Sequence, residues 1–179
     1  MITVSAVFFD VDSNKMEGKV PDELFALPSI RRLSIQDNMQ LTGSIPTIIS
    51  NSFRSMQLGG TKMGGPIQES FFDLVEMTEL NLERASFSGT IPESFINFQD
   101  IAILKLNNNT FTGPVPAAFA NLTHLNVLFL HGNKLEGSIS EAICDRRGIQ
   151  FSELNNLTAD CAGRQLVNCD CCTYCFSPP

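Results

Sequence analysis

The chain has 179 residues, a formal net charge of −7 and a hydrophobic fraction of 43%. This length and apolar content suffice for one domain with a continuous core and argue against a disordered or fibrous chain. Because no cluster of lysine and arginine stands in the sequence, we expect no nucleic-acid partner, and a polyanion is disfavoured too.

The chain opens with a short apolar segment, Met1 to Phe9, that lacks the basic start and the length of a signal peptide. No stretch reaches the roughly 18 apolar residues of a membrane span. We therefore expect no span and no signal peptide in this chain. Either its export is encoded elsewhere, or the chain is part of a longer receptor ectodomain.

The next segment, around Asp10, Asp12 and Asn14, has the D-x-D-x-N pattern that begins a calcium-binding loop. The match ends there, because Lys15 stands where such a loop needs glycine and Pro21 where it needs glutamate. Solvated strand side chains explain the two aspartates better. We expect no metal ion and no cofactor.

A repeat of 22 to 25 residues then governs the chain as far as residue 143. Its clearest copies are LKLNNNTFTGPVP at 104–116 and LFLHGNKLEGSI at 128–139, which are 24 residues apart. Agreement of several residue types at fixed offsets predicts a solenoid of six coils. One glycine marks each coil: Gly18, Gly43, Gly65, Gly89, Gly113 and Gly137.

Each coil starts with paired apolar positions that alternate with variable ones, as in a strand with one buried face. The expected inward pairs are Phe9 and Val11, Leu33 and Ile35, Met56 and Leu58, Leu80 and Leu82, Leu104 and Leu106, and Leu128 and Leu130. An apolar residue later in each coil is expected to fill the interior from the opposite side: Leu24, Ile49, Phe71, Phe95, Phe119 and Ile143.

This pattern resembles the leucine-rich repeat, LxxLxLxxNxLxGxIPxxLxxLxx, and within it the plant extracellular class marked by LxGxIP. The resemblance covers about residues 6–143. It implies an α/β solenoid with a parallel sheet on the concave side and irregular or short helical connections on the convex side. It also implies glycines that permit close coil contact, prolines that fix φ at the turn, and inward asparagines that bond loop amides: Asn14, Asn38, Asn109 and Asn133.

Two coils depart from the pattern in mid-solenoid. The third is two residues short, carries Thr61 at the asparagine position and has Gln68 in place of the proline. The fourth has Ala85 at the asparagine position. Sequence drift is one interpretation, and a local deformation that shapes a binding surface is the other.

A cysteine-rich segment follows the last coil, and it resembles the CxCCTxC ending of secreted leucine-rich-repeat proteins of diatoms. We therefore divide the chain into a solenoid, residues 1–143, and a cap, residues 144–179. An even number of cysteines in one terminal segment predicts disulfides, with adjacent Cys171 and Cys172 paired to different, distant partners. A thiolate zinc site is the disfavoured alternative. The six cysteines are Cys144, Cys161, Cys169, Cys171, Cys172 and Cys175.

Disulfides require an oxidising compartment, and three N-x-T glycosylation sequons point the same way. They begin at Asn108, Asn121 and Asn156. We expect an extracellular or cell-surface location.

Catalysis has little support in the sequence. His124 and His131 are the only histidines, and the repeat register yields no nucleophile with a base beside it. Glu79 and Glu83 resemble paired glycosidase carboxylates, but they lie on one exposed strand face. We expect the protein not to be an enzyme.

The variable strand positions project together from the concave sheet face. The resemblance to plant receptor ectodomains and polygalacturonase-inhibiting proteins implies that a protein, peptide or glycan binds there. A structural cell-wall or matrix solenoid, or an ice-binding-like surface, is the alternative, but such a surface needs regular rows of one residue type. The candidate ligand-binding residues are Arg32, Gln36, Gln57, Glu79, Asn81, Glu83, Ile103, Lys105, Asn107, Val127, Phe129 and His131.

Within this set, Ile103, Val127 and Phe129 form an apolar patch beside Lys105 and His131, which has the composition of a contact site. The alternative is that these apolar side chains pack against the cap.

Overall fold

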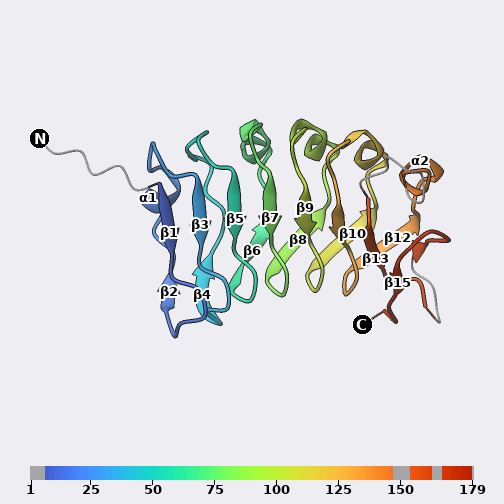
Figure 1. Ribbon diagram of the computed structural model, residues 1–179. Coiled ribbons are helices and arrows are strands. Elements are labelled where there is room, and N and C mark those ends of the chain that lie inside the picture. Colours follow the sequence, from blue (N-terminus) through green and yellow to red (C-terminus); the bar gives the residue numbers. More distant parts are fainter. Residues whose placement is uncertain (1–6, 147–153, 163–166, 179) are drawn as a thin grey trace, which may run out of the picture.

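The computed structural model describes residues 7–146, 154–162 and 167–178. They form an elongated solenoid in which successive coils stack along one axis (Figure 1). None of the described helices is long and apolar enough to cross a membrane.

One side of the solenoid is a parallel sheet, and its outward face, the predicted concave face, is here called the sheet face. The predicted inward pairs are confirmed in register, since Leu33 lies opposite Met56 and Leu80 opposite Leu104. Within the described residues the spatial order is β1 (Phe8–Asp10), β3 (Arg32–Ser34), β5 (Ser55–Gln57), β7 (Glu79–Asn81), β9 (Ile103–Lys105), β11 (Val127–Phe129), β13 (Asn156–Ala159) and β15 (Tyr174–Cys175).

A second parallel sheet, which the repeat pattern does not predict, lies behind the first in Figure 1. In this sheet, each strand from β2 to β12 contains the repeat glycine of its coil. Its described strands, in spatial order, are β14 (Val167–Asn168), β12 (Lys134–Ser138), β10 (Thr110–Pro114), β8 (Ser86–Thr90), β6 (Lys62–Pro66), β4 (Gln40–Gly43) and β2 (Glu17–Lys19).

The repeat glycines all serve backbone geometry, and half of them have open space where a side chain would stand. All six have positive φ, and a Cβ added to Gly18, Gly65 or Gly137 would meet no atom within 4 Å. The expectation of close coil contact is wrong at Gly18, whereas a Cβ on Gly113 would lie 3.3 Å from Thr90 of the preceding coil. Only a residue without a Cβ adopts the left-handed backbone there without strain.

Short helices line the remaining side, along the upper edge in Figure 1. Pro21, Pro92 and Pro116 each directly precede one of them, with φ of −61°, −71° and −56°. Gln68 takes φ −75° at the same place, so the third coil makes the turn without proline. The described helices are α1 (Asp22–Phe25), η1 (Glu69–Asp73), η2 (Glu93–Asn97), η3 (Ala117–Asn121) and α2 (Glu141–Cys144).

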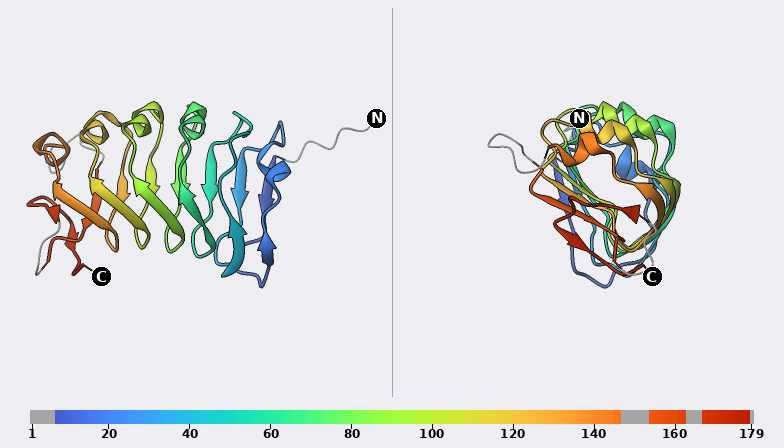
Figure 2. Two further views of the ribbon diagram at one scale, coloured as in Figure 1. Left: turned by 180° about the vertical axis from the view of Figure 1, so that it is seen from behind. Right: turned by 90° about the vertical axis from the view of Figure 1, so that its right-hand side faces the viewer.

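The two sheets and the helices enclose one interior, as the end view in Figure 2 shows. Leu24 and Ile49, expected to fill it in the first two coils, are only partly buried. Phe25 and Phe53, each 0% exposed, are buried there instead. Under the helices of the later coils, rings pack mostly edge to face with centroids 4.9–5.8 Å apart: Phe71, Phe72, Phe95, Phe98 and Phe119.

Both sheets continue past residue 143 into the cysteine-rich segment. Leu157 lies opposite Leu128 in the first sheet, and Val167 lies opposite Gly137 in the second. Leu157 and Val167 are buried at 0% and 1% exposure, so the cap covers the core of the sixth coil with apolar side chains of its own.

Candidate functional site

Inward asparagines tie consecutive coils together. Nδ2 of Asn109 donates to the carbonyl oxygens of Leu82 (2.7 Å) and Leu106 (3.1 Å), and its Oδ1 accepts from the amide of Phe87 (2.9 Å). The two carbonyl groups follow β7 and β9, and the amide belongs to β8. Because these groups are buried, the asparagine side chain supplies hydrogen bonds that water cannot. The same three kinds of bond are made by Asn38 and Asn133.

Three coils lack this arrangement. Asn14 is exposed and bonds only carbonyl oxygens of its own coil. Oγ1 of Thr61 donates to the carbonyl of Leu58 (2.8 Å) and accepts from the amide of Met63 (3.3 Å). By analogy with Asn109, an asparagine at position 85 would reach these same two groups. Thr61 therefore fills part of the gap that Ala85 leaves.

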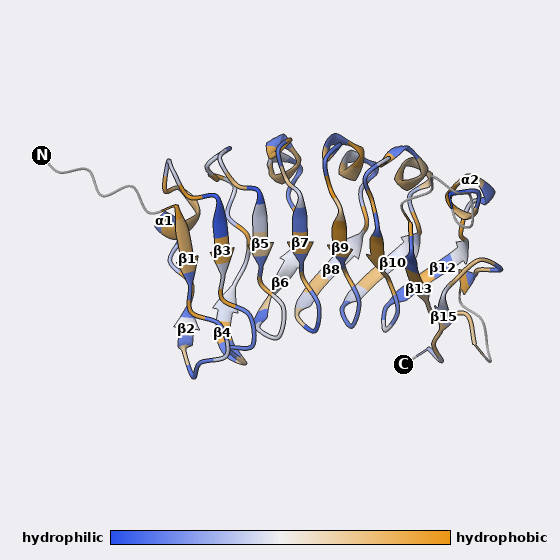
Figure 3. Cartoon of the chain, in the orientation of Figure 1, coloured by the Kyte–Doolittle hydropathy of each residue, from blue (hydrophilic) through white to orange (hydrophobic). Residues whose placement is uncertain are grey.

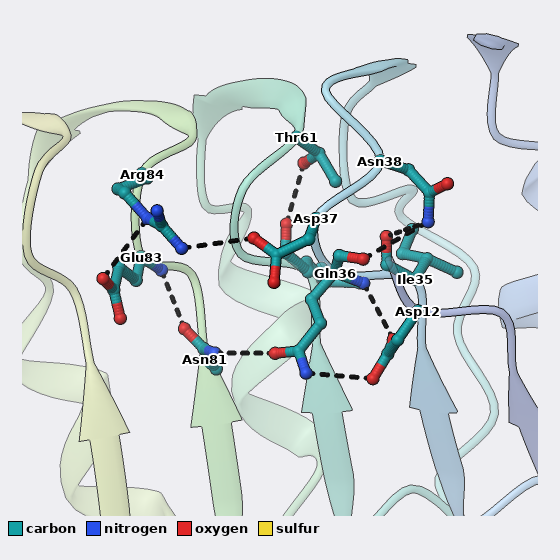
Figure 4. Close-up of polar contacts among 10 residues, drawn as sticks. Asp12, Ile35, Gln36, Asp37, Asn38, Thr61, Asn81, Glu83 and Arg84 are labelled. Atoms are coloured by element: carbon teal, nitrogen blue, oxygen red, sulfur yellow. Dashed lines mark hydrogen bonds and ion pairs between the residues drawn. The ribbon is translucent and has the colours of Figure 1, made fainter. Parts of the chain in front are cut away.

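On the sheet face, polar side chains of coils one, two and four form a connected network (Figure 4). Asp12 Oδ1 accepts from Ser34 Oγ (2.5 Å) and the Gln36 amide (3.0 Å), and Asp12 Oδ2 accepts from Gln36 Nε2 (2.9 Å). Gln36 Oε1 accepts from Asn81 Nδ2 (3.2 Å), whose own Oδ1 accepts from the Glu83 amide (3.0 Å). The expectation of a solvated Asp12 is therefore wrong, because this carboxylate is an acceptor within the network.

Two contacts of this region pass over the third coil. The Gln36–Asn81 bond joins the second coil to the fourth, and so does the ion pair between Arg84 Nη2 and Asp37 Oδ1 at 3.2 Å. Figure 4 shows both contacts side by side. These two contacts therefore join coils two and four directly.

Gly59 and Gly60 occupy the third coil beneath these contacts. A Cβ on Gly59 would come within 2.9 Å of Asn81 Oδ1, and a Cβ on Gly60 would overlap Asp37 Oδ1. Gly60 also has φ +66°. The short third coil thus provides the room that the bridging side chains use.

Towards the cap, the sheet face changes from polar to apolar. Figure 3 shows polar β3 and β7 in blue and apolar β9 in orange. Ile103 pairs with Val127 and Lys105 with Phe129 across β9 and β11, and all four are half-buried. Lys105 Nζ lies 5.8 Å from the Phe129 ring centroid, a cation–π distance.

The cap adds two aromatic side chains to this region that the sequence analysis missed. Tyr174 and Phe176 are 65% and 40% exposed, and Tyr174 pairs with Thr158 beside Phe129. The N-L-T-A sequence at 156–159 repeats the apolar alternation of earlier strands and is the signal that could have placed this strand in the sheet. We define the C-terminal patch as Ile103, Lys105, Val127, Phe129, His131, Tyr174 and Phe176.

His131 joins the sixth coil to its neighbours. Its Nδ1 lies 2.7 Å from Thr158 Oγ1 and its Nε2 lies 3.4 Å from Asn107 Nδ2, which suits a neutral ring that donates from Nδ1 and accepts at Nε2. The ring stacks on Phe176, with centroids 3.9 Å apart and planes 16° apart. Among the described residues, Asn107 Oδ1 is a buried atom with no hydrogen-bond partner.

Burial lowers the pKa of His131 from its ordinary value of 6.5, because the surroundings disfavour the charged ring. The negative charges of Asp160 and Glu83 oppose that lowering. The folded protein therefore favours the neutral imidazole.

Several predicted contact residues are less accessible than the strand pattern indicates. Gln57, Asn81 and Asn107 are 5%, 7% and 2% exposed, because neighbouring side chains on the sheet face cover them. Glu79 Oε2 accepts from Ser55 Oγ at 3.2 Å, and Glu83 pairs with Arg84 at 3.4 Å. Among the candidate residues, Arg32 is exposed, and Glu79, Glu83 and most of the C-terminal patch are half-buried.

All six cysteines of the chain lie in described residues and are joined as disulfides. Cys171 pairs with Cys144, 27 residues away, whereas Cys172 pairs with Cys169, three residues away. The expectation of different partners is confirmed, but that of a distant partner is wrong for Cys172. The third bridge joins Cys161 to Cys175.

Three cysteine sulfurs of the described cap lie close enough together to share a metal ion, but they are not free thiolates. The sulfurs of Cys161, Cys169 and Cys172 lie within 4.8 Å of one another, but each is bonded to another sulfur and offers no thiolate. In this oxidised arrangement the residues do not fit a zinc ion.

The sequon asparagines differ in surroundings. Asn108 is exposed at φ +56°, next to the sheet face, and Asn121 is exposed at the end of η3. Asn156 is half-buried on β13, where it pairs with Val127. A glycan on Asn156 would lie at the border of the C-terminal patch. Glycosylation at this sequon would therefore restrict the access of a ligand to the patch.

A family model for the leucine-rich repeat matches residues 75–135. Among curated proteins, none matches the chain. A plant ice-binding protein of known structure aligns with TM-score 0.59 and 24% identity over 76% of this chain and 42% of that chain, which shows the fold alone.

Two receptor kinase ectodomains from Arabidopsis align more closely than that ice-binding protein. GASSHO1/SCHENGEN3, in complex with CASPARIAN STRIP INTEGRITY FACTOR 2, has TM-score 0.76 and 27% identity over 91% of this chain. HAESA, in complex with the peptide hormone IDA and the co-receptor SERK1, has TM-score 0.75 and 28% identity over 83% of this chain. The chain spans 18% and 24% of the length of those two chains. The matched repeat and the stacked parallel coils together show a leucine-rich-repeat solenoid fold.

Proposed function

We propose that the protein is an extracellular recognition module that binds a peptide or protein through the C-terminal patch of its sheet face. The two receptor ectodomains above, solved with CASPARIAN STRIP INTEGRITY FACTOR 2 and with a peptide hormone, support a binding role rather than an enzymatic one. Disulfides support an oxidising location. Residues 144–179 serve as the cap of the solenoid formed by residues 1–143.

The observation that carries the proposal is the contrast along the sheet face. In coils one, two and four, the polar side chains of Asp12, Gln36 and Asn81 form hydrogen bonds with one another. In the C-terminal patch, the rings of Phe129, Tyr174 and Phe176 keep part of their surface exposed. Aromatic side chains of this kind, beside a cation, are the usual anchors of binding interfaces.

The test is to locate where a bound peptide lies. Peptides selected from a random display library on the oxidised protein should slow amide hydrogen exchange in β9, β11 and β15. Protection confined to the second sheet or to the short helices would contradict the proposal.

A surface-binding role of the ice-binding kind is the second candidate. On the second sheet, Ser88 lies beside Thr110 and Thr90 beside Thr112, which makes short regular rows of hydroxyl groups. Neither row continues on the neighbouring strands, because Pro66 on β6 pairs with Ser88 and Lys134 on β12 pairs with Thr112. Thermal hysteresis that Thr112→Lys abolishes would favour this role, and its absence in the unaltered protein would remove it.

A further inference from the structure

Carboxylates border the C-terminal patch on the side away from the cap. Glu79 lies directly opposite Ile103 in the sheet, and Glu83 follows the same strand two residues after Asn81. Both are half-buried on the sheet face. A ligand that covers Ile103 and Val127 therefore also meets acidic groups.

These carboxylates are incompletely neutralised. The contact found for Glu79 is a neutral hydroxyl, Ser55 Oγ at 3.2 Å. Glu83 has Arg84 at 3.4 Å, but that guanidinium is shared with Asp37 at 3.2 Å. Within the described residues, no ion pair shorter than 4.0 Å joins Lys105 to either glutamate, and its ammonium lies by the Phe129 ring instead.

The charge of the whole molecule acts in the same direction. The net charge of −7 attracts cations over distances comparable with the Debye length, and two carboxylates beside the apolar Ile103 concentrate that attraction locally. A basic group of a ligand therefore complements the carboxylates of coil four. An apolar or aromatic group of the same ligand complements the C-terminal patch.

The spacing of the two surfaces restricts the ligand. Glu79 on β7 and Val127 on β11 lie in the same register two strands apart, which is roughly 10 Å in a parallel sheet. In an extended peptide, side chains two residues apart share one face at about 7 Å, and the long stem of arginine or lysine covers the remainder.

We infer that the C-terminal patch binds an extended peptide segment in which an arginine or lysine stands two residues from an aromatic or large apolar residue. Glu79 and Glu83 hold the basic group, and Val127 and Phe129 hold the apolar one. This inference rests on the proposed function of the patch and adds the class of its ligand.

The test uses short capped peptides and the methyl signals of Ile103 and Val127 in nuclear magnetic resonance spectra. Acetyl-Arg-Gly-Phe-amide and acetyl-Phe-Gly-Arg-amide cover both chain directions, and acetyl-Glu-Gly-Phe-amide and acetyl-Phe-Gly-Glu-amide reverse the charge. At least one basic peptide should shift these methyl signals at about fivefold lower concentration than its acidic counterpart, an advantage that added salt reduces.

A double variant separates the ligand class from the site. Glu79→Gln with Glu83→Gln should remove the preference for the basic peptides, whereas Glu136→Gln, on exposed β12, should preserve it. Equal binding of basic and acidic peptides, lost in Phe129→Ala, would overturn the ligand class while leaving the site in place. Absence of any shift at Ile103 and Val127, with peptides bound elsewhere, would overturn both.

Discussion

Asp37 and Arg84 are 47 residues apart in the sequence, yet Oδ1 of the first lies 3.2 Å from Nη2 of the second, across the third coil. Their side chains are 38% and 57% exposed, so water and salt screen the pair. The contact depends on Gly60, which leaves the space that the Asp37 carboxylate fills. The free space at Gly60 therefore contributes more to stability than the attraction between the charges of Asp37 and Arg84.

Gly60→Ala should lower the free energy of unfolding by about 2 kcal/mol or more, since it adds a clash with Asp37 to an unfavourable backbone conformation. Gly65→Ala is the matched control, because Gly65 also has positive φ but open space around its Cβ position. Arg84→Gln should cost less than about 1 kcal/mol. Urea denaturation measures all three, and equal costs for the two glycine variants would exclude a steric role.

Asn109→Ala and Asn133→Ala should each destabilise the protein strongly, because each removes the partner of a buried amide and of two carbonyl groups. The expected loss is roughly 1–3 kcal/mol for each group left unsatisfied. Asn14→Ala, at an exposed asparagine of the same repeat position, should change the melting temperature little. Similar melting temperatures for Asn109→Ala and Asn14→Ala would contradict the assigned role of the ladder.

Thr61 and position 85 should be energetically coupled. Ala85→Asn alone should have a small effect, because Thr61 already bonds the Leu58 carbonyl and the Met63 amide. In a Thr61→Ala background the same change should restore about 1 kcal/mol or more, since the asparagine then finds both groups free. A double-mutant cycle measures this coupling, and strictly additive effects would count against it.

Stability should fall as the pH is lowered through the titration of His131. Its pKa is lowered by burial, so the unfolded chain binds the proton more tightly, and the stabilisation is complete above pH 6.5 and lost below it. Between about pH 7.5 and about pH 5, His131→Gln should flatten part of the decline in unfolding free energy. His124→Gln, at an exposed histidine, should leave this decline in unfolding free energy unchanged. Parallel profiles for His131→Gln and the unaltered protein would refute this assignment.

The strands of the sheet face could be predicted because Leu33, Leu80 and Leu104 repeat an alternation with one physical cause, burial of one side. The second sheet could not, because its strands contain glycines such as Gly65, whose positive φ interrupts the alternation and leaves no periodic apolar signal. Likewise, the sequence gives no measure of how far neighbours cover a polar side chain such as Gln57.

Placement of Tyr174 and Phe176 on the sheet face depends on how the cap folds back. Sequence spacing leaves the disulfide connectivity undetermined, so it could not show that β15 joins the sheet beside β13. Asp37 and Arg84 were missed for a related reason, because a contact across a whole coil exists only where that coil lacks side chains.

Phe129→Ala tests most directly whether ligand recognition belongs to the C-terminal patch. For a peptide selected on the unaltered protein, affinity and melting temperature are measured for Phe129→Ala and for Gln99→Ala, an exposed residue after η2. Phe129→Ala should weaken binding by about 2 kcal/mol or more with little change in melting temperature, and Gln99→Ala should alter neither. A sharp fall in the melting temperature of Phe129→Ala with affinity intact would show instead that the ring belongs to the packing of the cap.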